Sequence, residues 1–543
     1  MQPRRRPFLS PALTSARAGA PTSAASAGAP GPLRQAVLLA LAAGLSGFTI
    51  LQGISPHDEG LLLHAGARIA AGQWPYRDFW MNYPPGQPLA LAGLQEIFGA
   101  SLLTWRVLVT VLDALVALLA YRLARRRAPE LYALGAWVAV AAAMAYPSLP
   151  GPNPPALALA FGALLVGRRR PGLGGVLAGL TCLFRFEVGV AAIIGVLLEA
   201  PRGSRLRTGA VAIACGLMTL APFFAVAPAA MLHDTVGFYA IQGLQRLPFP
   251  LAFSGPLRPS KLIEFYIPVI LVAGLALWGL AMAVAVMIAG QPARASAAIR
   301  GGIVAQARAR TPSPEAWSLV PLALVGLGYL LGRTDEFHLV PLAAVLPVML
   351  AGAAAGARVW TLRIVLLVML ALIAVHGLER RAGQALHPPA LAAVPGPVGD
   401  GVQTDPADAH ALARLEREIA KLTRPHEPIF VANPRFDRVE AGDPLLYVIL
   451  GHPNPTRYDV MQPGVVTTAP VQREIIGSLR RSRCRVVIRW LDPRATPVEP
   501  NGSGRSSGVH ILDRYLAAHF APAARYGVYE VLVSSALRRA RAR

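Results

Sequence analysis

Cysteine is scarce in this sequence, and its scarcity argues against two kinds of site. The 543 residues include three cysteines, Cys182, Cys215 and Cys484. The first two lie in apolar blocks and the third opens a predicted strand, so their spacing forms neither a metal-binding motif nor a disulfide framework. We expect three free, buried thiols.

Charged residues are also few for a chain of this length. They make up 15% of the sequence, hydrophobic residues make up 54%, and the mean hydropathy is +0.46. A soluble protein of this size is less apolar, and here the apolar residues fall in long blocks. The composition predicts a mainly α-helical, polytopic membrane protein.

Acidic residues are fewer than basic ones, 29 against 52, which gives a net charge of +23. No basic stripe is interleaved with aromatic residues, as a nucleic-acid groove requires, so we predict no nucleic-acid partner. The arginines instead cluster in links between apolar blocks, as the positive-inside rule expects for cytoplasmic loops. These links contain Arg4 to Arg6, Arg125 to Arg127, Arg168 to Arg170, Arg202 to Arg207, Arg294 to Arg310, and Arg358 with Arg363.

The apolar blocks predict about eleven membrane crossings. Because every second connection is rich in arginine, the amino terminus is expected in the cytoplasm and the carboxy-terminal segment outside. Several blocks are shorter than the roughly 20 residues of a full crossing, so the parity is firmer than the number. The predicted spans are Ala36–Leu51, Leu102–Leu119, Leu131–Tyr146, Pro155–Val166, Leu173–Phe184, Val188–Leu198, Gly209–Val226, Ile263–Ile288, Leu319–Leu331, Leu339–Ala355 and Thr361–Val375.

Composition divides the chain into four parts. Residues 1–32 form a basic tail without acids, predicted to be disordered and cytoplasmic, and 33–378 form the transmembrane domain with a first outer loop at 54–98. Residues 379–400 are a linker rich in proline and glycine, and 401–543 are a small extracytoplasmic α/β domain. In that domain "PIFVA" (428–432), "LLYVIL" (445–450), "CRVVIRWL" (484–491) and "YGVYEVLV" (526–533) are predicted strands, and 469–482 an amphipathic helix.

A glycine-rich stretch, "GLGGVLAGL" (172–180), does not predict a nucleotide site. No strand precedes it, and it lies in a membrane block. Small residues in such a block let helices pack closely.

Polar residues gather in three stretches that the topology places on the outer face. The first loop contains "HDEG" (57–60) and "GQWPYRDFWMNYPPG" (72–86), followed later by "FRFEVG" (184–189) and "GRTDEFHLVP" (332–341). A charge at the bilayer centre costs about 2.5–3.5 kcal/mol on insertion scales, so charges retained at depth usually serve a site. We expect one polar-ligand site from these residues: Asp58, Glu59, Arg77, Asp78, Tyr83, Arg185, Arg333, Asp335 and His338.

Each stretch also has a structural explanation. Ser55 can cap a helix whose capping box Asp58 closes. Arg185 can pair with Glu187, and Arg333 with Asp335 in a solvated loop. The following segment, "LLLHAGARIAAG" (61–72), predicts either a helix in the membrane interface beside a lipid path or one packed against the bundle.

Together these motifs resemble bacterial membrane glycosyltransferases of the GT-C type, in the group of protein mannosyltransferases and lipid A aminoarabinose transferases. The resemblance rests on "HDEG" after the first span, "PYRDFWMNYPPG" at the end of the same loop, an arginine in a later turn and "GRTDEFH" before a late span. It covers residues 36 to 378, and "PLLYVILGHPNPTRYD" is similar to the outer domain of such proteins.

The resemblance implies a transferase in the bacterial inner membrane that uses a polyprenyl-phosphate-linked sugar and acts on the outer face. The acid of the first loop, Asp58 here, would be the catalytic base or orient the acceptor, with Glu59 supporting it. The aminoarabinose transferases carry an acid-Lys-Pro element where this chain has Asn82-Tyr83-Pro84. The lysine contact to lipid phosphate is therefore missing, and neither donor sugar nor acceptor carries over.

The chemistry expected outside the cytoplasmic membrane agrees with this implication. An acceptor hydroxyl that attacks an anomeric carbon needs a carboxylate base, and a departing phosphate needs cations. Asp58 suits the first task, and Arg77, Arg185, Arg333 or His338 the second.

Since helix neighbours point about 100° apart, Asp58 and Glu59 are expected to serve different partners. A divalent metal held by Asp58 and His57 stays open, as does the acceptor: a glycan, a lipid or a protein.

Two other classes remain as alternatives. A transporter or lipid flippase usually has internal repeats and broken helices at the midplane, whereas this sequence has no convincing repeat and its charges lie at outer ends. A non-catalytic envelope assembly protein would work through its outer domain.

Overall fold

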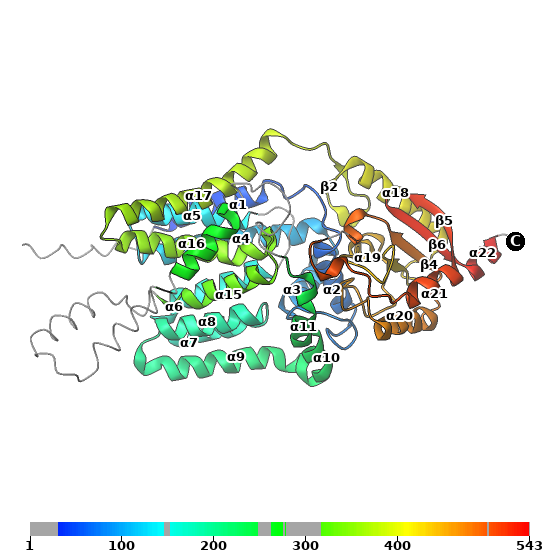
Figure 1. The fold of residues 1–543 in the computed structure, drawn as a ribbon, viewed down its shortest axis with the longest axis horizontal. Coiled ribbons are helices and arrows are strands. Elements are labelled where there is room, and N and C mark those ends of the chain that lie inside the picture. The colour runs from blue at the N-terminus through cyan, green and yellow to red at the C-terminus, as the bar shows by residue number, and fades with distance from the viewer. Residues whose placement is uncertain are drawn as a thin grey trace, which may run out of the picture.

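The structure, a computed structural model, describes residues 31–145, 152–247, 262–274, 277, 317–496 and 499–541. Figure 1 shows a bundle of long helices at one end and a smaller domain with strands at the other, with the short helices α2 and α3 between them. Residues 1–30 of the predicted tail lie outside the described residues. So do most residues beyond Gly274 in the predicted span Ile263–Ile288.

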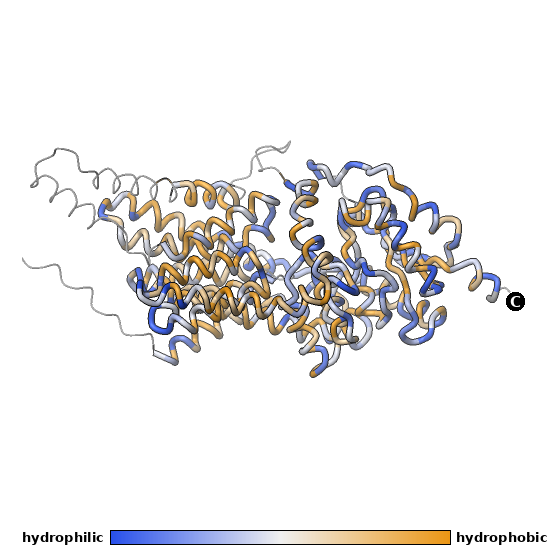
Figure 2. The backbone as a smooth tube through the Cα atoms, turned by 90° about the horizontal axis from the view of Figure 1, so that it is seen from below, coloured by the Kyte–Doolittle hydropathy of each residue, from blue (hydrophilic) through white to orange (hydrophobic). Residues whose placement is uncertain are grey.

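The helix bundle follows the apolar blocks of the sequence. Its helices are α1 (Pro32–Gly47), α4 (Leu102–Arg125), α5 (Glu130–Met144), α6 (Asn153–Gly167), α7 (Pro171–Thr181), α8 (Phe186–Glu199), α9 (Arg205–Val226), α15 (Val320–Gly332), α16 (Glu336–Gly356) and α17 (Trp360–Leu386). Among the described residues, four helical segments are long and apolar enough to cross a membrane: Leu102–Arg125, Arg202–Val226, Glu336–Gly356 and Trp360–Leu386. Figure 2 shows hydrophobic residues along the bundle and mixed polarity in the other domain.

Glycines allow the close approach of α7 and α9, as the sequence predicted for the segment 172–180. A Cβ added to Gly175 would lie 2.7 Å from the Thr208 carbonyl oxygen, and one on Gly179 would lie 2.4 Å from that of Ala212. Real Cβ atoms do not come so near, so only glycine fits at these two crossings. Small residues serve such helix contacts widely in membranes.

The carboxy-terminal domain is built on a four-stranded mixed sheet in the order β3-β4-β6-β5. Its strands are β3 (Phe430–Ala432), β4 (Val486–Trp490), β5 (Phe520–Tyr526) and β6 (Tyr529–Ser534), and its longer helices are α18 (Pro406–Leu422), α20 (Ala469–Arg481) and α21 (Ile511–His519). β3 pairs parallel with β4, and the other pairs are antiparallel. β1 (Ala392–Ala393) and β2 (Gln403–Thr404) form a separate small pair, and α22 (Ser535–Arg541) ends the described chain.

The strand predicted at 445–450 is wrong, because this segment forms the helix α19 (Leu445–Leu450). A short run of six apolar residues fits a buried helix as well as a buried strand. The Asp443 carboxylate accepts the Leu446 amide at the start of the helix, and Gly451 ends it with a φ of +65°. Five of its six residues are buried, so the run has no alternation to reveal its class.

The first loop, between α1 and α4, contains two helices, α2 (Asp58–Ala70) and α3 (Gly86–Phe98). Leu62 and Leu63 of α2 and Leu91 of α3 belong to one hydrophobic core with Trp105 of α4 and with residues of the carboxy-terminal domain. Helices α2 and α3 therefore share a core with both of their neighbours. Helix α2 is packed, as one of the two alternatives from the sequence expects.

Candidate functional site

Helix α2 presents three faces to three different neighbours. Glu59 and Gly66 face α4 and α3, where Glu59 pairs with Arg106 and a Cβ on Gly66 would lie 2.8 Å from the Leu91 Cβ. Asp58 and Ala65 are seven residues apart and share a second face, on which Ala65 packs in a cluster with aromatic residues of the first loop and with Phe223 of α9. The third face contacts the carboxy-terminal domain.

Glu59 belongs to a buried ion pair. Arg106 Nε lies 2.8 Å from Glu59 Oε1 and Arg106 Nη2 lies 2.9 Å from Oε2, and the two side chains are 7% and 1% exposed. The same guanidinium donates to the carbonyl oxygens of Ile50 and Gly53, at 2.8 and 2.7 Å. Glu59 thus fixes the chain where it leaves α1.

The capping explanation for Asp58 is wrong. The N-cap residue of α2 is His57, without a side-chain cap, and the Ser55 amide donates to Glu59 Oε2 at 3.3 Å. Within the described residues, the half-buried Asp58 carboxylate forms no hydrogen bond or ion pair. Glu59 thus holds a cation and an amide, as the sequence predicted for one of the two acids, whereas Asp58 has no such partner within the described residues.

Tyr83 lies near enough to Asp58 for the charge of that carboxylate to act on its hydroxyl. The buried Tyr76 holds it, because the Tyr76 hydroxyl donates to the Tyr83 carbonyl at 2.8 Å while Tyr76 itself has a φ of +67°. Burial, with the neighbouring Asp58 and Glu187 charges, raises the pKa of the Tyr83 hydroxyl, so it stays protonated at neutral pH. A positive φ at a bulky residue is rare and marks a strained turn.

Arg185 brings the second stretch to the first. The Gly86 amide donates to the Leu183 carbonyl at 2.8 Å, and a Cβ on Gly86 would lie 2.5 Å from the same oxygen. This close approach places the Arg185 guanidinium carbon 5.7 Å from the Tyr83 ring centroid. Arg185 is 5% exposed and pairs with Glu187.

The third stretch joins the same group through an aromatic contact. The Arg185 guanidinium carbon lies 4.4 Å from the Tyr329 ring centroid, and the Tyr329 and His338 rings are 4.3 Å apart. His338 Nδ1 lies 2.6 Å from Asp335 Oδ1, and Asp335 caps α16 by accepting the His338 amide at 2.9 Å. Parts of the three stretches thus meet, because Tyr83, Arg185 and His338 are joined through the Tyr329 ring.

Arg333 faces the carboxy-terminal domain instead. Its Nη1 donates to Glu499 Oε2 at 2.9 Å, its Nε donates to Asp335 Oδ2 at 2.8 Å, and Glu440 Oε1 lies 3.5 Å from Nη1. Three carboxylates therefore surround this one guanidinium. Its charge is already neutralised by the protein.

Arg77 and Asp78 form a local pair at the surface of the loop. Arg77 Nη2 lies 2.7 Å from Asp78 Oδ2, and the side chains are 50% and 31% exposed. Asp78 also accepts the Trp74 amide at 2.7 Å, and the hydrogen bond from Arg77 lowers the pKa of Asp78. The pair closes the turn 74–78, and within the described residues no hydrogen bond or ion pair joins it to Tyr83 or Arg185.

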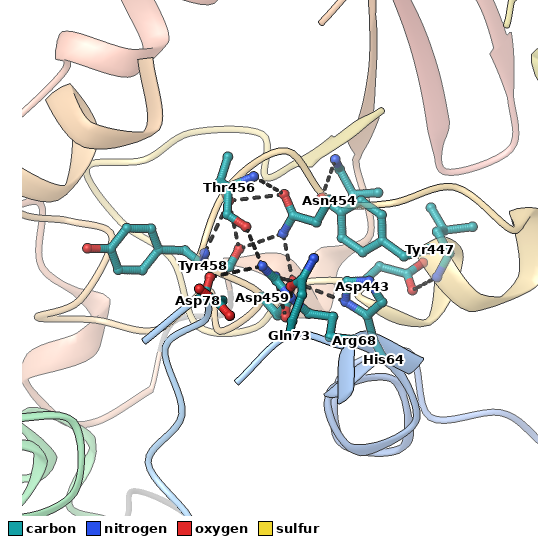
Figure 3. Close-up of polar contacts among 12 residues, drawn as sticks. His64, Arg68, Gln73, Asp78, Asp443, Tyr447, Asn454, Thr456, Tyr458 and Asp459 are labelled. Carbon is teal, nitrogen blue, oxygen red and sulfur yellow. Dashed lines mark hydrogen bonds and ion pairs between the residues drawn. The ribbon is translucent and has the colours of Figure 1, made fainter. Parts of the chain in front are cut away.

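Two groups of buried polar residues were not among the site residues predicted from the sequence. Figure 3 shows the first, a buried network in which Arg68 Nη1 lies 2.9 Å from Asp459 Oδ2 and His64 Nδ1 lies 3.1 Å from Asp459 Oδ1. Although burial opposes ionisation, Arg68 and His64 hold the pKa of Asp459 well below its ordinary value. Asn454 also donates to Asp459, at 2.6 Å. The polar residues His64 and Arg68, in the mainly apolar segment 61–72, were the feature of the sequence that could have indicated this network.

The second group is Gln87, one residue beyond the quoted loop motif. It is 1% exposed, and neither its amide oxygen nor its amide nitrogen has a hydrogen-bond partner among the described residues. A buried amide of this kind costs about 1–3 kcal/mol, so it requires an explanation.

One group of side chains in the described part of the chain could hold a metal ion, although protein donors already contact two of its members. Asp437, His510 and Asp513 place ligand atoms within 4.8 Å of one another in the carboxy-terminal domain. Arg435 donates to both oxygens of Asp437, at 2.6 and 2.5 Å, and the Phe436 amide donates to Asp513. For the pair Asp58 and His57, His57 Nδ1 is already occupied by the Gly442 amide at 3.2 Å.

Several solved structures are similar to this chain at low sequence identity. They include ArnT from Cupriavidus metallidurans bound to undecaprenyl phosphate, with 14% identity, a TM-score of 0.49 and coverage of 92% of this chain and 98% of that one. The arabinofuranosyltransferase AftD from Mycobacteria has 15% identity and a TM-score of 0.46, and covers 93% of this chain and 40% of that one. The oligosaccharyltransferase AglB from Archaeoglobus fulgidus, in complex with an inhibitory peptide and a dolichol-phosphate, has 14% identity, a TM-score of 0.44 and coverage of 85% and 70%.

These neighbours are GT-C proteins. No family model and no curated protein sequence matches the chain.

Proposed function

We propose that this protein is a membrane glycosyltransferase that moves a sugar from a polyprenyl-phosphate donor to an acceptor hydroxyl on the extracytoplasmic face. One observation carries the proposal: the half-buried Asp58 carboxylate forms no hydrogen bond or ion pair within the described residues. A carboxylate that no protein group occupies is available to a substrate. The motifs of the outer stretches support the same class.

Asp58 is proposed as the general base. The acceptor oxygen forms a bond to the anomeric carbon while the bond from that carbon to the phosphate oxygen breaks. The acceptor proton passes to Asp58, and the polyprenyl phosphate leaves with the bonding electrons. A positioned base contributes roughly 10²–10⁴-fold to such a step.

Arg185 is proposed as the cation that stabilises the departing phosphate. It is buried between the rings of Tyr83 and Tyr329, where a charge acts more strongly than in water. Glu187 already offsets part of its charge. Arg333 suits this role less, because Glu499, Glu440 and Asp335 surround it.

The proposed setting is the bacterial cytoplasmic membrane, with about eleven crossings, the amino terminus inside and residues 401–543 outside. The arginine-rich links support this orientation. The acceptor is a glycan, a lipid or a protein, and the neutral tyrosine hydroxyl of Tyr83 is a suitable hydrogen-bond donor for a sugar oxygen.

Asp58→Asn tests the base. In proteoliposomes with a panel of undecaprenyl-phosphate-linked sugars and a membrane extract as acceptor source, we expect turnover to fall by roughly 10²–10⁴ while undecaprenyl phosphate still binds. Asp78→Asn is the matched control, because it neutralises another acid of the same loop and should remain active. Normal turnover by Asp58→Asn would exclude Asp58 as the base.

Arg185→Gln tests the phosphate contact. Loss of a charge-assisted hydrogen bond should weaken undecaprenyl phosphate binding by about 1.5–3 kcal/mol, roughly 10–150-fold, as measured by native mass spectrometry. Arg333→Gln should leave that binding unchanged. Movement of the lipid across the bilayer without release of its sugar would instead favour a flippase.

A further inference from the structure

One side of α2 is in contact with the carboxy-terminal domain along its whole length. His57, Gly60, His64 and Arg68 recur every three or four residues and therefore lie on one side of the helix. His64 stacks on Tyr447 with ring centroids 4.6 Å apart. The ion pair of Arg68 with Asp459 lies at the carboxyl end of this side.

The contacts at the first turn of α2 are made with backbone. The Gly442 amide donates to His57 Nδ1 at 3.2 Å, and the Leu445 amide donates to the Pro56 carbonyl at 3.2 Å. A Cβ added to Gly60 would lie 2.3 Å from the Leu445 nitrogen. This turn therefore fits against the start of α19 only if residue 60 has no side chain.

Burial lowers the pKa of His57 although the neighbouring Asp58 opposes it. The imidazole is then neutral near pH 7, and a neutral ring can accept the Gly442 amide at Nδ1. The charged group that acts on the His57 imidazole is Asp58, on the same turn.

We propose that the carboxy-terminal domain positions Asp58 for the reaction, through His57 and Gly60, which act as positioning residues at the first turn of α2. This inference rests on the proposed function. Asp58 lies between these two residues in sequence, so any shift of the turn displaces its carboxylate. A misplacement of about 1 Å can cost roughly 100-fold in rate.

Gly60→Ala is the direct test, and Gly93→Ala is its matched control. Gly93 lies in α3 of the same loop, and a Cβ there would meet nothing within 4 Å. We expect Gly60→Ala to lose roughly 10–100-fold in kcat while binding undecaprenyl phosphate normally, because α19 must move away from the new methyl group. Gly93→Ala should match the wild type. Equal kcat values for Gly60→Ala and Gly93→Ala would overturn the inference.

His57 variants distinguish positioning from a general loss of folding. Asn carries an oxygen close to the position of Nδ1, so His57→Asn should retain the bond from Gly442 and most of kcat. His57→Leu removes the acceptor and should lower kcat without changing undecaprenyl phosphate binding. Equal kcat values for His57→Asn and His57→Leu would count against a role for this bond.

Hydrogen exchange separates a failure of this inference from a failure of the proposed function. Amides 58–64 should exchange faster in Gly60→Ala than in Gly93→Ala, with the bundle unchanged in both. Unchanged exchange overturns the positioning contact whatever the turnover. If Asp58→Asn is fully active, the proposed base is wrong, and the exchange result still decides whether the domain holds α2.

Discussion

Glu59→Gln should destabilise the protein far more than Asp58→Asn, although the two acids are adjacent. Glu59 is 1% exposed at its side chain and is paired with Arg106, whereas Asp58 has no such partner within the described residues. Removing one member of a buried ion pair typically costs about 3–5 kcal/mol, because the other charge remains buried. Arg106 would keep its bonds to the Ile50 and Gly53 carbonyls, so we expect about 3 kcal/mol.

The measurement is thermal unfolding of the purified variants in one detergent, followed by tryptophan fluorescence. Asp58→Asn should lie within about 0.5 kcal/mol of the wild type, as for a substitution that removes no stabilising partner. The double variant Glu59→Leu with Arg106→Leu should lose less free energy of unfolding than the sum of the losses of Glu59→Leu and Arg106→Leu alone. The reason is that the double variant leaves no unpaired charge buried. The reasoning is refuted if Glu59→Gln unfolds at the same temperature as Asp58→Asn.

Three further predictions concern other sites. Burial raises the pKa of Asp443 to about 7, so the folded state keeps a proton that the unfolded chain loses above about pH 4. Stability should therefore fall as pH rises from about 4 to about 7, and Asp443→Asn should abolish that fall in the unfolding temperature. Gln87→Leu should raise the unfolding temperature, because it removes a buried amide without partners in the described structure, and a fall would show that the amide is satisfied. A reporter fused after Arg127 should be cytoplasmic and one fused after Gly399 external; the reverse would invert the topology.

Hydrophobic periodicity was enough to predict the helices of the bundle, because membrane spans need long apolar segments. It failed at 445–450, where six apolar residues carry no period, and at β5, which contains Pro522 and a register shift. The strand at 430–432 and the helix at 469–481 were predicted because their patterns are clear. Local sequence thus determined the regular elements and left short apolar runs undecided.

The sequence indicated which polar residues to consider for the candidate site, but it did not indicate which residues they contact. The helix period was sufficient to predict that Asp58 and Glu59 point in different directions, and the cation predicted for one of the two acids is the partner of Glu59. Arg106 was not predictable as the partner, because it lies 47 residues away in a helix that reads as a membrane span. Arg333 was assigned to a ligand because the carboxylates around it, Glu440 and Glu499, are distant in sequence. Pairing across domains is invisible to a local pattern.

Helix α17 has a consequence for how the protein responds to its bilayer. Its 27 residues span about 40 Å at 1.5 Å per residue, against a hydrocarbon core of about 30 Å. The carboxyl-terminal part of α17 is bonded to the segment that follows α1, because Arg381 donates to the Thr49 hydroxyl at 2.8 Å. Only residues 387 to 391 separate α17 from β1. So short a connection restricts how far β1 can move relative to α17. A thicker or thinner membrane should therefore change the height and tilt of the carboxy-terminal domain. Under the proposed function, lipid composition would then alter the distance between the lipid-linked donor and Asp58.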